Sequence, residues 1–430
     1  MPRVLVISHN IFSKSGNMGK TMMEFLKCVP PEDLAQLYFH SEIPTVDCCY
    51  RYWRIKDADM LHSIGNRKGR YTVFTKEDID TSLQKSRTDK GNIGKIYQMG
   101  RKRTPMIYFL RNTLWKLGVW DTPQLHEWIQ EFNPELIFFA CGDYSFAYRI
   151  VYKLSVRYQI PVLPWCCDNY YIGRDGGSLL QRWNQKSLMK WARKVMSRAK
   201  TILTISDRMA RDYGKLFEKP TEILRIPTQK LKRKKNEKER QGIVYAGNLG
   251  VNRSTPLVEL ARSLKKAEIP GLEYVDVYSG EQNPKTLEKL TEENGIRFHG
   301  AVSAKEMANI LSNARYMLHV EAFDERSKLR TGYSLSTKIG ECLGSGACVV
   351  AYGPKDISSM EYLNQNQAAV FSEDTTEIIE SLKQLEKEKE LYLEYIRHAE
   401  QVVWDCHNKE KNDVIMKNLL IETSNSPHMF

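Results

Sequence analysis

The stretch His319–Pro354, HVEAFDERSKLRTGYSLSTKIGECLGSGACVVAYGP, decides the fold of this chain. It opens on the end of an apolar strand, passes through a polar loop, and enters a short helix that we expect to begin near Thr337. An apolar run at Cys348–Tyr352 then predicts a second strand. Strands that alternate with helices in this way form parallel sheets, which bind ligands beyond the carboxyl ends of their strands.

The expected helix has the composition of an anion-binding site. Ser334 or Ser336 can cap its first turn, where free backbone amides and the helix dipole favour a negative charge. Lys338 and Glu341 are three residues apart and therefore share one face of the helix. The pattern fits a ligand that carries phosphates and sugar hydroxyls, although a solvated Lys/Glu pair on an ordinary surface helix is the commoner origin of this spacing.

Composition narrows the class of protein. The chain has 430 residues, too many for a single hydrophobic core, with no run of about 18 apolar residues and no signal-peptide pattern. Nine cysteines without a CxxC pair, and nine histidines without an HxxxH spacing, favour reduced thiols and no protein-held metal. We therefore expect a soluble, cytoplasmic protein of two or three domains.

The formal net charge of +12 gathers in two basic segments. Residues 81–120 hold nine Lys/Arg against a single acid, with aromatic residues between them, and residues 181–200 hold seven Lys/Arg and no acid. In the second segment Leu188, Trp191 and Val195 recur at helical spacing, which predicts a basic amphipathic helix. Any one such helix is more commonly a solvated face, but the pair favours an anionic membrane surface or an anionic acceptor.

The order of strand, loop and helix recurs along the chain. An apolar strand at Arg3–Ser8 leads into a loop containing Gly16 and Gly19 and then a helix, which begins a doubly wound sheet. The charged stretch Thr228–Gly242 predicts a domain boundary, and a nucleic-acid role for its lysine run is the less common alternative. Further strands are expected at residues 135–142, 160–166, 201–206, 242–248, 273–280, 296–300, 314–320, 347–353 and 368–371.

The carboxy-terminal half resembles the corresponding domain of retaining, nucleotide-sugar-dependent glycosyltransferases of the GT-B fold, and is most similar to glycosyltransferase family 4. The resemblance is carried by YAGNLGVNRS, by FHGAVSAKEM, and by HVEAFD followed at a distance by STKIGECLGSGACVVAYGP. It implies an α/β fold of two Rossmann-like domains that face a central cleft. These would span residues 1–227, on the acceptor side, and 243–400, which bind the donor nucleotide, with a linker at 228–242 and a helix within 401–430 that returns to the first domain.

The resemblance also gives individual positions expected roles. Glu341 matches the glutamate that binds the donor's ribose, and Ser336, Thr337 and Lys338 match the helix start that faces the diphosphate. Glu321 resembles the first glutamate of the family's paired-glutamate motif, which lies near the transferred sugar. Nineteen residues rather than the usual seven separate the two glutamates, which indicates an extra loop over residues 324–335.

The remaining expected site residues flank this motif. Arg253 would meet the phosphates, since Asn248 stands where many members carry arginine, and Gly16 and Gly19 would face the donor from the first domain. Arg253, Lys338 and Glu321 are thus the expected catalytic residues, with fixed cations stabilising the leaving diphosphate. Three residues at or beyond predicted strand ends are candidates for the acceptor side, although capping is the commoner role of each: His9, Asp143 and Asp168.

The expected function is transfer of a sugar from a nucleotide-diphosphate sugar to a glycan or lipid-linked glycan with retention, in cell-surface polysaccharide biosynthesis. We expect no cofactor and no metal; the partners are the donor, the acceptor and an anionic membrane at its inner face, and not nucleic acid. Two alternatives remain open. One is a non-catalytic polyanion- or nucleic-acid-binding protein, and the other is an inverting GT-B transferase or a nucleotide-sugar epimerase.

Overall fold

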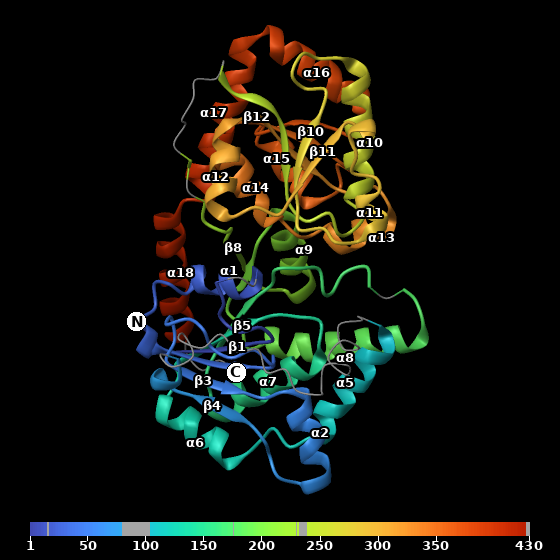
Figure 1. Ribbon diagram of the computed structural model, residues 1–430. Helices are drawn as coiled ribbons and strands as arrows, with labels where there is room; N and C mark the ends of the chain where they lie inside the picture. Colours follow the sequence, from blue (N-terminus) through green and yellow to red (C-terminus); the bar gives the residue numbers. More distant parts are fainter. Residues whose placement is uncertain (15–16, 80–103, 175, 229, 232–238, 427–430) are drawn as a thin grey trace. The chain divides into compact units, whose positions relative to one another are not determined.

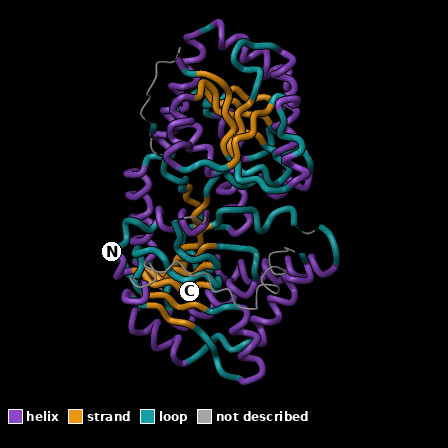
Figure 2. Tube along the Cα trace, viewed as in Figure 1, coloured by secondary structure: helices purple, strands orange, loops and turns teal. Residues whose placement is uncertain are grey.

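The computed structural model describes residues 1–14, 17–79, 104–174, 176–228, 230–231 and 239–426. The chain divides into two compact units. The first comprises Met1–Ile205, Met209–Leu224 and Asp413–Phe430, and the second comprises Ser206–Arg208 and Arg225–Asn412. Each unit has one sheet with helices packed against it (Figures 1 and 2). The expected α/β architecture of two parallel-sheet domains is therefore confirmed.

The first unit contains an eight-stranded sheet in the order β4-β3-β2-β1-β5-β6-β7-β8. Its strands are β1 (Val4–Ser8), β2 (Leu34–Tyr38), β3 (Arg51–Arg54), β4 (Thr72–Phe74), β5 (Leu136–Ala140), β6 (Val162–Trp165), β7 (Ile202–Thr204) and β8 (Thr221–Ile223). All neighbours pair in parallel except β3 and β4, which are antiparallel. Every residue of β1, β2 and β5 is buried, as expected for central strands covered on both faces.

Helices follow most of the strands of this unit along the chain. They are α1 (Asn17–Phe25), α2 (Asp57–Asn66), α5 (Pro105–Leu117), α6 (Pro123–Phe132), α7 (Ser145–Tyr158), α8 (Leu179–Met196) and α9 (Asp207–Phe217), together with most of α18 (Lys409–Ser424). Thr104 and Thr122 cap α5 and α6, and proline follows each in the first turn, where its missing N–H has no partner to lose. Local sequence thus sets where α5 and α6 start.

The second unit contains a parallel six-stranded sheet in the order β11-β10-β9-β12-β13-β14. Its strands are β9 (Gln241–Ala246), β10 (Val275–Tyr278), β11 (Ile296–Gly300), β12 (Ala314–Val320), β13 (Cys348–Tyr352) and β14 (Val370–Ser372). Its helices are α10 (Ser254–Ala267), α11 (Pro284–Leu287), α12 (Ala304–Asn313), α13 (Glu325–Thr331), α14 (Thr337–Gly344), α15 (Ser358–Gln365), α16 (Thr375–Lys387) and α17 (Lys389–Cys406). One apolar cluster joins α10, α16 and α17 to the sheet.

Three sequence expectations need correction. The extra loop predicted over residues 324–335 is wrong, because Asp324 caps a helix, α13, within it. The loop that was expected to contain Gly19 already becomes helical at Asn17, so Gly19 belongs to α1. The strands β2, β3, β4 and β8 were not expected, since polar residues such as Gln36 interrupt their apolar runs. Most of the first basic segment, residues 81–103, lies outside the described residues.

Candidate functional site

The helix α14 begins as its sequence predicts. Ser336 is its N-cap, and the Ser336 side chain accepts a hydrogen bond of 3.3 Å from the backbone N–H of Lys338. Ile339 and Leu343 are fully buried, so the opposite face of the helix remains for polar contacts. The helix follows β12 in the chain and precedes β13, two paired strands of the parallel sheet. Its first turn therefore belongs to the sheet edge where ligands of such folds bind.

Lys338 and Glu341 form an ion pair on the exposed face of α14. The Lys338 Nζ lies 2.8 Å from Glu341 Oε2, and the two side chains are 44% and 40% exposed. An exposed pair of this kind contributes little to folding stability. Both groups can therefore exchange partners with a ligand at small cost.

A second ion pair, between Arg253 and Glu321, is buried. Arg253 donates to both carboxylate oxygens of Glu321, from Nε at 3.1 Å and from Nη2 at 2.8 Å. The side chain of Glu321 is 2% exposed and that of Arg253 is 18% exposed. Burial raises the pKa of Glu321, while the charge and hydrogen bonds of Arg253 and a hydrogen bond from Thr331 lower it. Thr331 is the last residue of α13, so the inserted helix contributes to this site.

His319 lies beside the Arg253–Glu321 ion pair, and the sequence analysis did not identify it as a site residue. It lies two residues before Glu321 at the end of β12, and its Nε2 is 3.6 Å from Glu321 Oε1. Burial, followed by the nearby charge of Arg253, lowers the pKa of His319 to about 3, so the imidazole is neutral at physiological pH. Side chains two apart in a strand point to the same side, and this alternation was the signal that pairs His319 with Glu321.

The other expected donor-side residues have local contacts. The Asn248 side chain accepts a hydrogen bond from the backbone N–H of Gly250 and thereby shapes the turn after β9. A Cβ atom on Gly19 would lie 2.3 Å from the carbonyl oxygen of Ile11, so the absence of a side chain there lets α1 approach its own preceding loop. Gly16 lies outside the described residues.

In the first unit, two of the three acceptor-side candidates join one cluster. His9 follows β1, and its Nδ1 lies 3.5 Å from Arg111 Nη2. The Arg111 guanidinium stacks over the Tyr144 ring at 4.1 Å, and the Tyr144 ring lies 5.0 Å from that of Tyr108. The Tyr108 hydroxyl donates a 2.5 Å hydrogen bond to Asp143, which follows β5. The cluster therefore combines aromatic faces, a cation and a carboxylate, a composition suited to sugars.

Sequence reasoning missed the residues that connect His9 with Asp143. Arg111 and Tyr108 come from α5, within the segment that was noted only for its basic and aromatic composition. The third candidate, Asp168, accepts a hydrogen bond from the backbone N–H of Asn169, and its carbonyl accepts one from the Tyr213 hydroxyl. Asp168 thus has the turn-closing contacts that were its commoner alternative.

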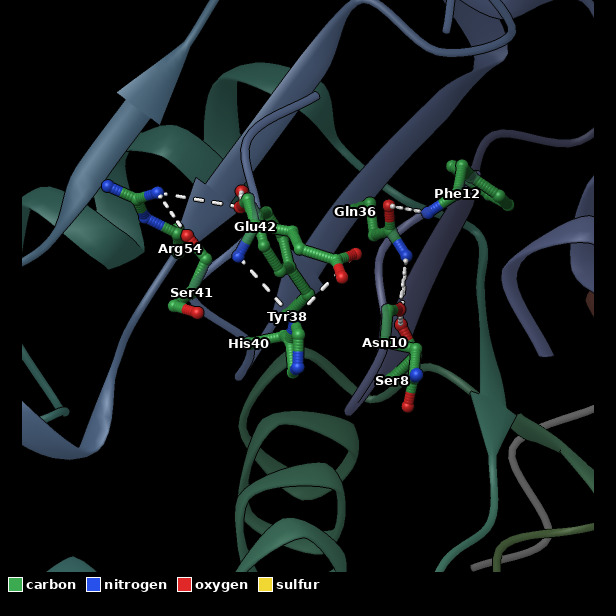
Figure 3. Close-up of polar contacts among 9 residues, drawn as sticks. All are labelled: Ser8, Asn10, Phe12, Gln36, Tyr38, His40, Ser41, Glu42 and Arg54. Atoms are coloured by element: carbon green, nitrogen blue, oxygen red, sulfur yellow. Dashed lines mark hydrogen bonds and ion pairs between the residues drawn. The ribbon is translucent and has the colours of Figure 1, made fainter. Parts of the chain in front are cut away.

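A buried glutamine sets the shape of the loop after β1. The Oε1 of Gln36, on β2, accepts a hydrogen bond from the backbone N–H of Phe12 at 3.3 Å. Its Nε2 donates to the Ser8 hydroxyl at 2.8 Å and to the Asn10 carbonyl at 3.1 Å (Figure 3). Gln36 is fully buried, so these bonds replace the ones it would make to water. The loop between β1 and α1 is held by a residue from the neighbouring strand.

The loop after β2 is braced in the same way. Arg54, on β3, donates from Nη1 to the Ser41 carbonyl at 3.0 Å, and the Tyr38 hydroxyl donates to the Glu42 carbonyl at 2.8 Å (Figure 3). Adjacent loops at the carboxyl edge of this sheet are therefore fixed by side chains from the strands beneath them. Among the residues that the structure describes, no group of three His, Cys, Asp or Glu side chains has the arrangement of a metal site.

Comparison with known proteins gives one family match and a consistent set of structures. Residues 253–412 match a family model described as glycosyl transferase-like. No curated protein is similar enough to the chain to count as a relative. Within the described part of the chain, none of the helices combines the length and apolar character required to cross a bilayer.

The solved structures that the chain resembles share its whole length. Alr3699/HepE of Anabaena, in complex with UDP, has a TM-score of 0.61 at 11% identity, covering 98% of this chain and 100% of that one. Sucrose-phosphate synthase from Thermosynechococcus elongatus has a TM-score of 0.59 at 10% identity, covering 98% of each chain. WaaG, a glycosyltransferase involved in lipopolysaccharide biosynthesis, has a TM-score of 0.53 at 12% identity, covering 96% of this chain and 99% of that one.

These similarities define the class of the protein. The likeness to solved structures establishes the GT-B fold over the full chain. The family match covers the part of the second unit that holds Arg253, Glu321 and α14. The chain therefore has the GT-B fold that its sequence motifs predicted, and its second unit is similar to a glycosyl transferase-like family.

Proposed function

We propose that the protein transfers a sugar, with retention of anomeric configuration, from a nucleotide-diphosphate sugar to a glycan or lipid-linked glycan acceptor. The main support for this proposal is a set of polar groups around β12 and α14. The set consists of a capped helix start, an exposed Lys338–Glu341 ion pair and a buried Arg253–Glu321 ion pair. Two of the solved structures that it resembles contain UDP, and one of these also contains glucose. These support a nucleotide sugar as the donor.

The diphosphate has suitable partners in the second unit. Negative charge grows on the leaving diphosphate as the glycosidic bond breaks, and fixed cations and backbone amides stabilise it. Arg253 uses Nε and Nη2 to hold Glu321, so its Nη1 can donate to a phosphate oxygen. The amides at the start of α14 and the Lys338 ammonium group supply further donors. Glu341 would release Lys338 to the phosphates and accept hydrogen bonds from the ribose hydroxyls.

The transferred sugar belongs near Glu321 in this proposal. With Arg253 bound to both of its oxygens, Glu321 is held as a carboxylate beside the neutral imidazole of His319. A carboxylate that is paired in this way orients hydroxyl groups and partial positive charge, and is poorly suited to leave its arginine and act as a nucleophile. We therefore assign Glu321 to sugar positioning, and the departing phosphate to deprotonation of the acceptor hydroxyl.

For the acceptor, we propose the cluster of His9, Arg111, Tyr144, Tyr108 and Asp143 in the first unit. Its aromatic rings can stack on sugar faces, and Asp143 and Arg111 can bind hydroxyl or acidic groups. We further propose that the glycan belongs to a cell-surface polysaccharide made on the cytoplasmic face of a membrane. The proposal that the glycan is a cell-surface polysaccharide made at a membrane is supported by the likeness to WaaG and by the basic segments of the first unit.

A ligand screen tests the donor site. Nucleoside diphosphates and their sugars are added to the protein, and thermal stabilisation is measured for wild type, Glu341→Ala and a matched variant, Glu380→Ala. Glu380 forms an equivalent pair with Lys383 on α16, at 2.9 Å and three residues apart. We expect one nucleotide family to stabilise wild type and Glu380→Ala but not Glu341→Ala. No stabilisation by any nucleotide would contradict the proposed function, and equal stabilisation of both variants would contradict the assigned site.

The stereochemical course needs its own experiment. Once the donor is known, the anomeric configuration of the first product is read by proton NMR from the coupling constant of the new linkage. We expect the configuration of the donor to be kept. An inverted product would replace the proposed mechanism by one that requires a protein base, and His9 and Asp143 would then be the first residues to examine.

A further inference from the structure

The helix α8 has a continuous cationic outer face. Arg182, Lys186, Lys190 and Arg193 are all exposed, and their separations of four, four and three residues place them along one side of the helix. The opposite side is buried through Leu188, Ala192, Val195 and Met196. Residues 178–200 contain no acid, so no carboxylate on this helix offsets the charge. Packing of the buried side explains the helical spacing of the apolar residues in the sequence. It does not explain why the exposed side carries a row of cations.

Exposed apolar side chains adjoin the amino-terminal end of this face. Leu179 and Trp183 are 83% and 50% exposed, and each lies three residues before a member of the cationic row. On α5, Met106 and Leu110 are 55% and 56% exposed. We call these four residues the α5/α8 corner. Isolated exposed apolar residues are ordinary on protein surfaces, whereas a group of large ones beside a row of cations marks an interaction surface.

Direct contacts fix the α5/α8 corner. The rings of Phe109 and Trp183 meet edge to face, with centroids 5.2 Å apart. The Asn184 side chain donates a hydrogen bond of 2.7 Å to the carbonyl of Pro105, at the start of α5. The four apolar side chains are therefore presented by two helices that are tied together, and both helices belong to the first unit (Figure 1).

We propose that the α5/α8 corner and the cationic row of α8 together bind an anionic lipid bilayer. The row complements acidic headgroups, and each lysine or arginine close to such a surface strengthens attachment. Trp183 suits the headgroup region, while Leu179, Met106 and Leu110 gain by entering the apolar layer beneath it. A soluble polyanion such as nucleic acid uses the cations equally well but gains nothing from three exposed aliphatic side chains. The apolar residues thus favour the bilayer.

The inference deepens the proposed function and rests on it, because it gives a glycosyltransferase with a lipid-linked acceptor a surface that holds it at the membrane. The residues that carry it differ from those assigned to the donor and acceptor. Its failure can therefore be separated from failure of the proposed function.

Vesicle flotation tests the surface with the full-length protein. Binding is measured for phosphatidylcholine vesicles with and without phosphatidylglycerol, using wild type and three double variants. These are Lys186→Ala with Lys190→Ala on the cationic row, Leu179→Ser with Trp183→Ser at the α5/α8 corner, and Lys387→Ala with Lys389→Ala as a control. The control removes two exposed lysines from α16 and α17, and so lowers the net charge equally.

We expect wild type and the control to bind the phosphatidylglycerol vesicles, and the lysine variant to bind them about tenfold more weakly. The serine variant should also bind more weakly, and its residual binding should be abolished by salt, because only charge contacts remain. The inference is overturned if wild type does not bind the phosphatidylglycerol vesicles. It is also overturned if the control loses as much binding as the lysine variant, or if the serine variant binds as tightly as wild type. The last outcome identifies the row as a polyanion site, which retention on heparin would confirm.

Nucleotide-induced thermal stabilisation is measured on the same variants. We expect all of them to respond as wild type does, since none of the substituted residues belongs to the donor site. Vesicle binding without any nucleotide response in wild type would support the membrane surface and contradict the proposed transferase donor site. A normal nucleotide response without vesicle binding would support the proposed donor site and contradict the membrane surface.

Discussion

Arg253 in the second unit and Arg111 in the first are both largely buried arginines that pair with a carboxylate, but their partners differ. Arg253 holds Glu321, whose side chain is 2% exposed, through two hydrogen bonds. Arg111 holds Asp57, whose side chain is 42% exposed, at 2.9 Å, and its guanidinium also stacks on Tyr144. The carboxylate that pairs with Arg253 is thus buried, whereas the carboxylate that pairs with Arg111 is partly solvated.

This difference separates two kinds of binding site. At the proposed donor site, Arg253 and Glu321 are charged and largely buried, so strong electrostatic contacts fix their positions. In the cluster proposed to bind the acceptor, aromatic stacking dominates, and the contacts are individually weaker and less directional. A nucleoside diphosphate has invariant chemistry and suits the first arrangement. Acceptor glycans vary in shape, and aromatic surfaces suit such variation.

The comparison is most severely tested by removing each arginine. Arg253→Ala leaves Glu321 buried without its partner, and we expect the free energy of unfolding to fall by about 3–5 kcal/mol. Arg111→Ala leaves a half-exposed Asp57 and removes stacking, and should cost only about 1–2 kcal/mol. Urea unfolding at neutral pH measures both values. Equal losses would show that the two pairs do not differ in the way described.

The pH dependence of the stability of Arg253→Ala identifies why this variant is destabilised. Without Arg253, burial is the main influence on Glu321, and it raises the pKa of that carboxyl above its usual value of 4.5. The folded state then binds a proton more readily than the unfolded state, so stability falls as pH rises through this window. We expect Arg253→Ala to recover part of its lost stability when the pH is lowered from 7 towards 5. Adding Glu321→Gln should recover it at pH 7 and abolish the pH dependence.

The second test concerns the first unit and its loop after β1. Gln36→Leu removes three hydrogen bonds from a fully buried side chain and takes away the partner of the Phe12 N–H, while the Asn10 carbonyl keeps its hydrogen bond from the Ser8 hydroxyl. We expect stability to fall by about 2 kcal/mol. Gln185→Leu serves as the control, because among the described residues the Gln185 side chain has one hydrogen bond to remove, which it donates to the Tyr170 carbonyl. It should cost less than half as much by urea unfolding, and a similar cost for both would argue against the bracing role of Gln36.

The third test compares two serine caps within the second unit. Ser336→Ala and Ser303→Ala each remove an N-cap, from α14 and α12 respectively, and each should cost about 1 kcal/mol of stability. Only Ser336 lies at the proposed diphosphate site, so only Ser336→Ala should weaken nucleotide binding by calorimetry, by about fivefold. Loss of nucleotide affinity in the Ser303 variant would mean that general loosening of the unit, and not the α14 terminus, controls binding.

The contrast between the two sites also explains what the sequence could predict. The start of α14, its serine cap and the face shared by Lys338 and Glu341 depend on neighbours within a few residues. Such features follow from spacing and capping rules, and the structure confirms them. The parallel sheets were predictable for the same reason, because strands such as β5 and β13 are apolar runs with clear boundaries.

The unpredicted features depend on contacts between distant positions. Nothing near Arg111 in the sequence indicates that it meets His9, which lies 102 residues away. Gln36 can be buried in a central strand because the Asn10 carbonyl and the Phe12 N–H form hydrogen bonds with its side chain. No local sequence pattern around Gln36 indicates these contacts. The helix α13 escaped prediction because its polar composition is that of a loop, and its Asp324 cap is evident only when the helix is known.

The smallest expected effect decides whether the aromatic cluster binds the acceptor. Tyr108→Phe keeps the ring but removes its hydrogen bond to Asp143, and should cost about 1 kcal/mol of stability. Tyr158→Phe removes a comparable bond to His126, at the opposite end of α7 from Tyr144, and should cost about the same. If the cluster holds the acceptor, only Tyr108→Phe removes a contact that positions Asp143, so the KM for acceptor should rise severalfold while the KM for donor stays unchanged. A similar rise in both variants, or in neither, would remove the acceptor from this cluster and leave its aromatic residues with a packing role alone.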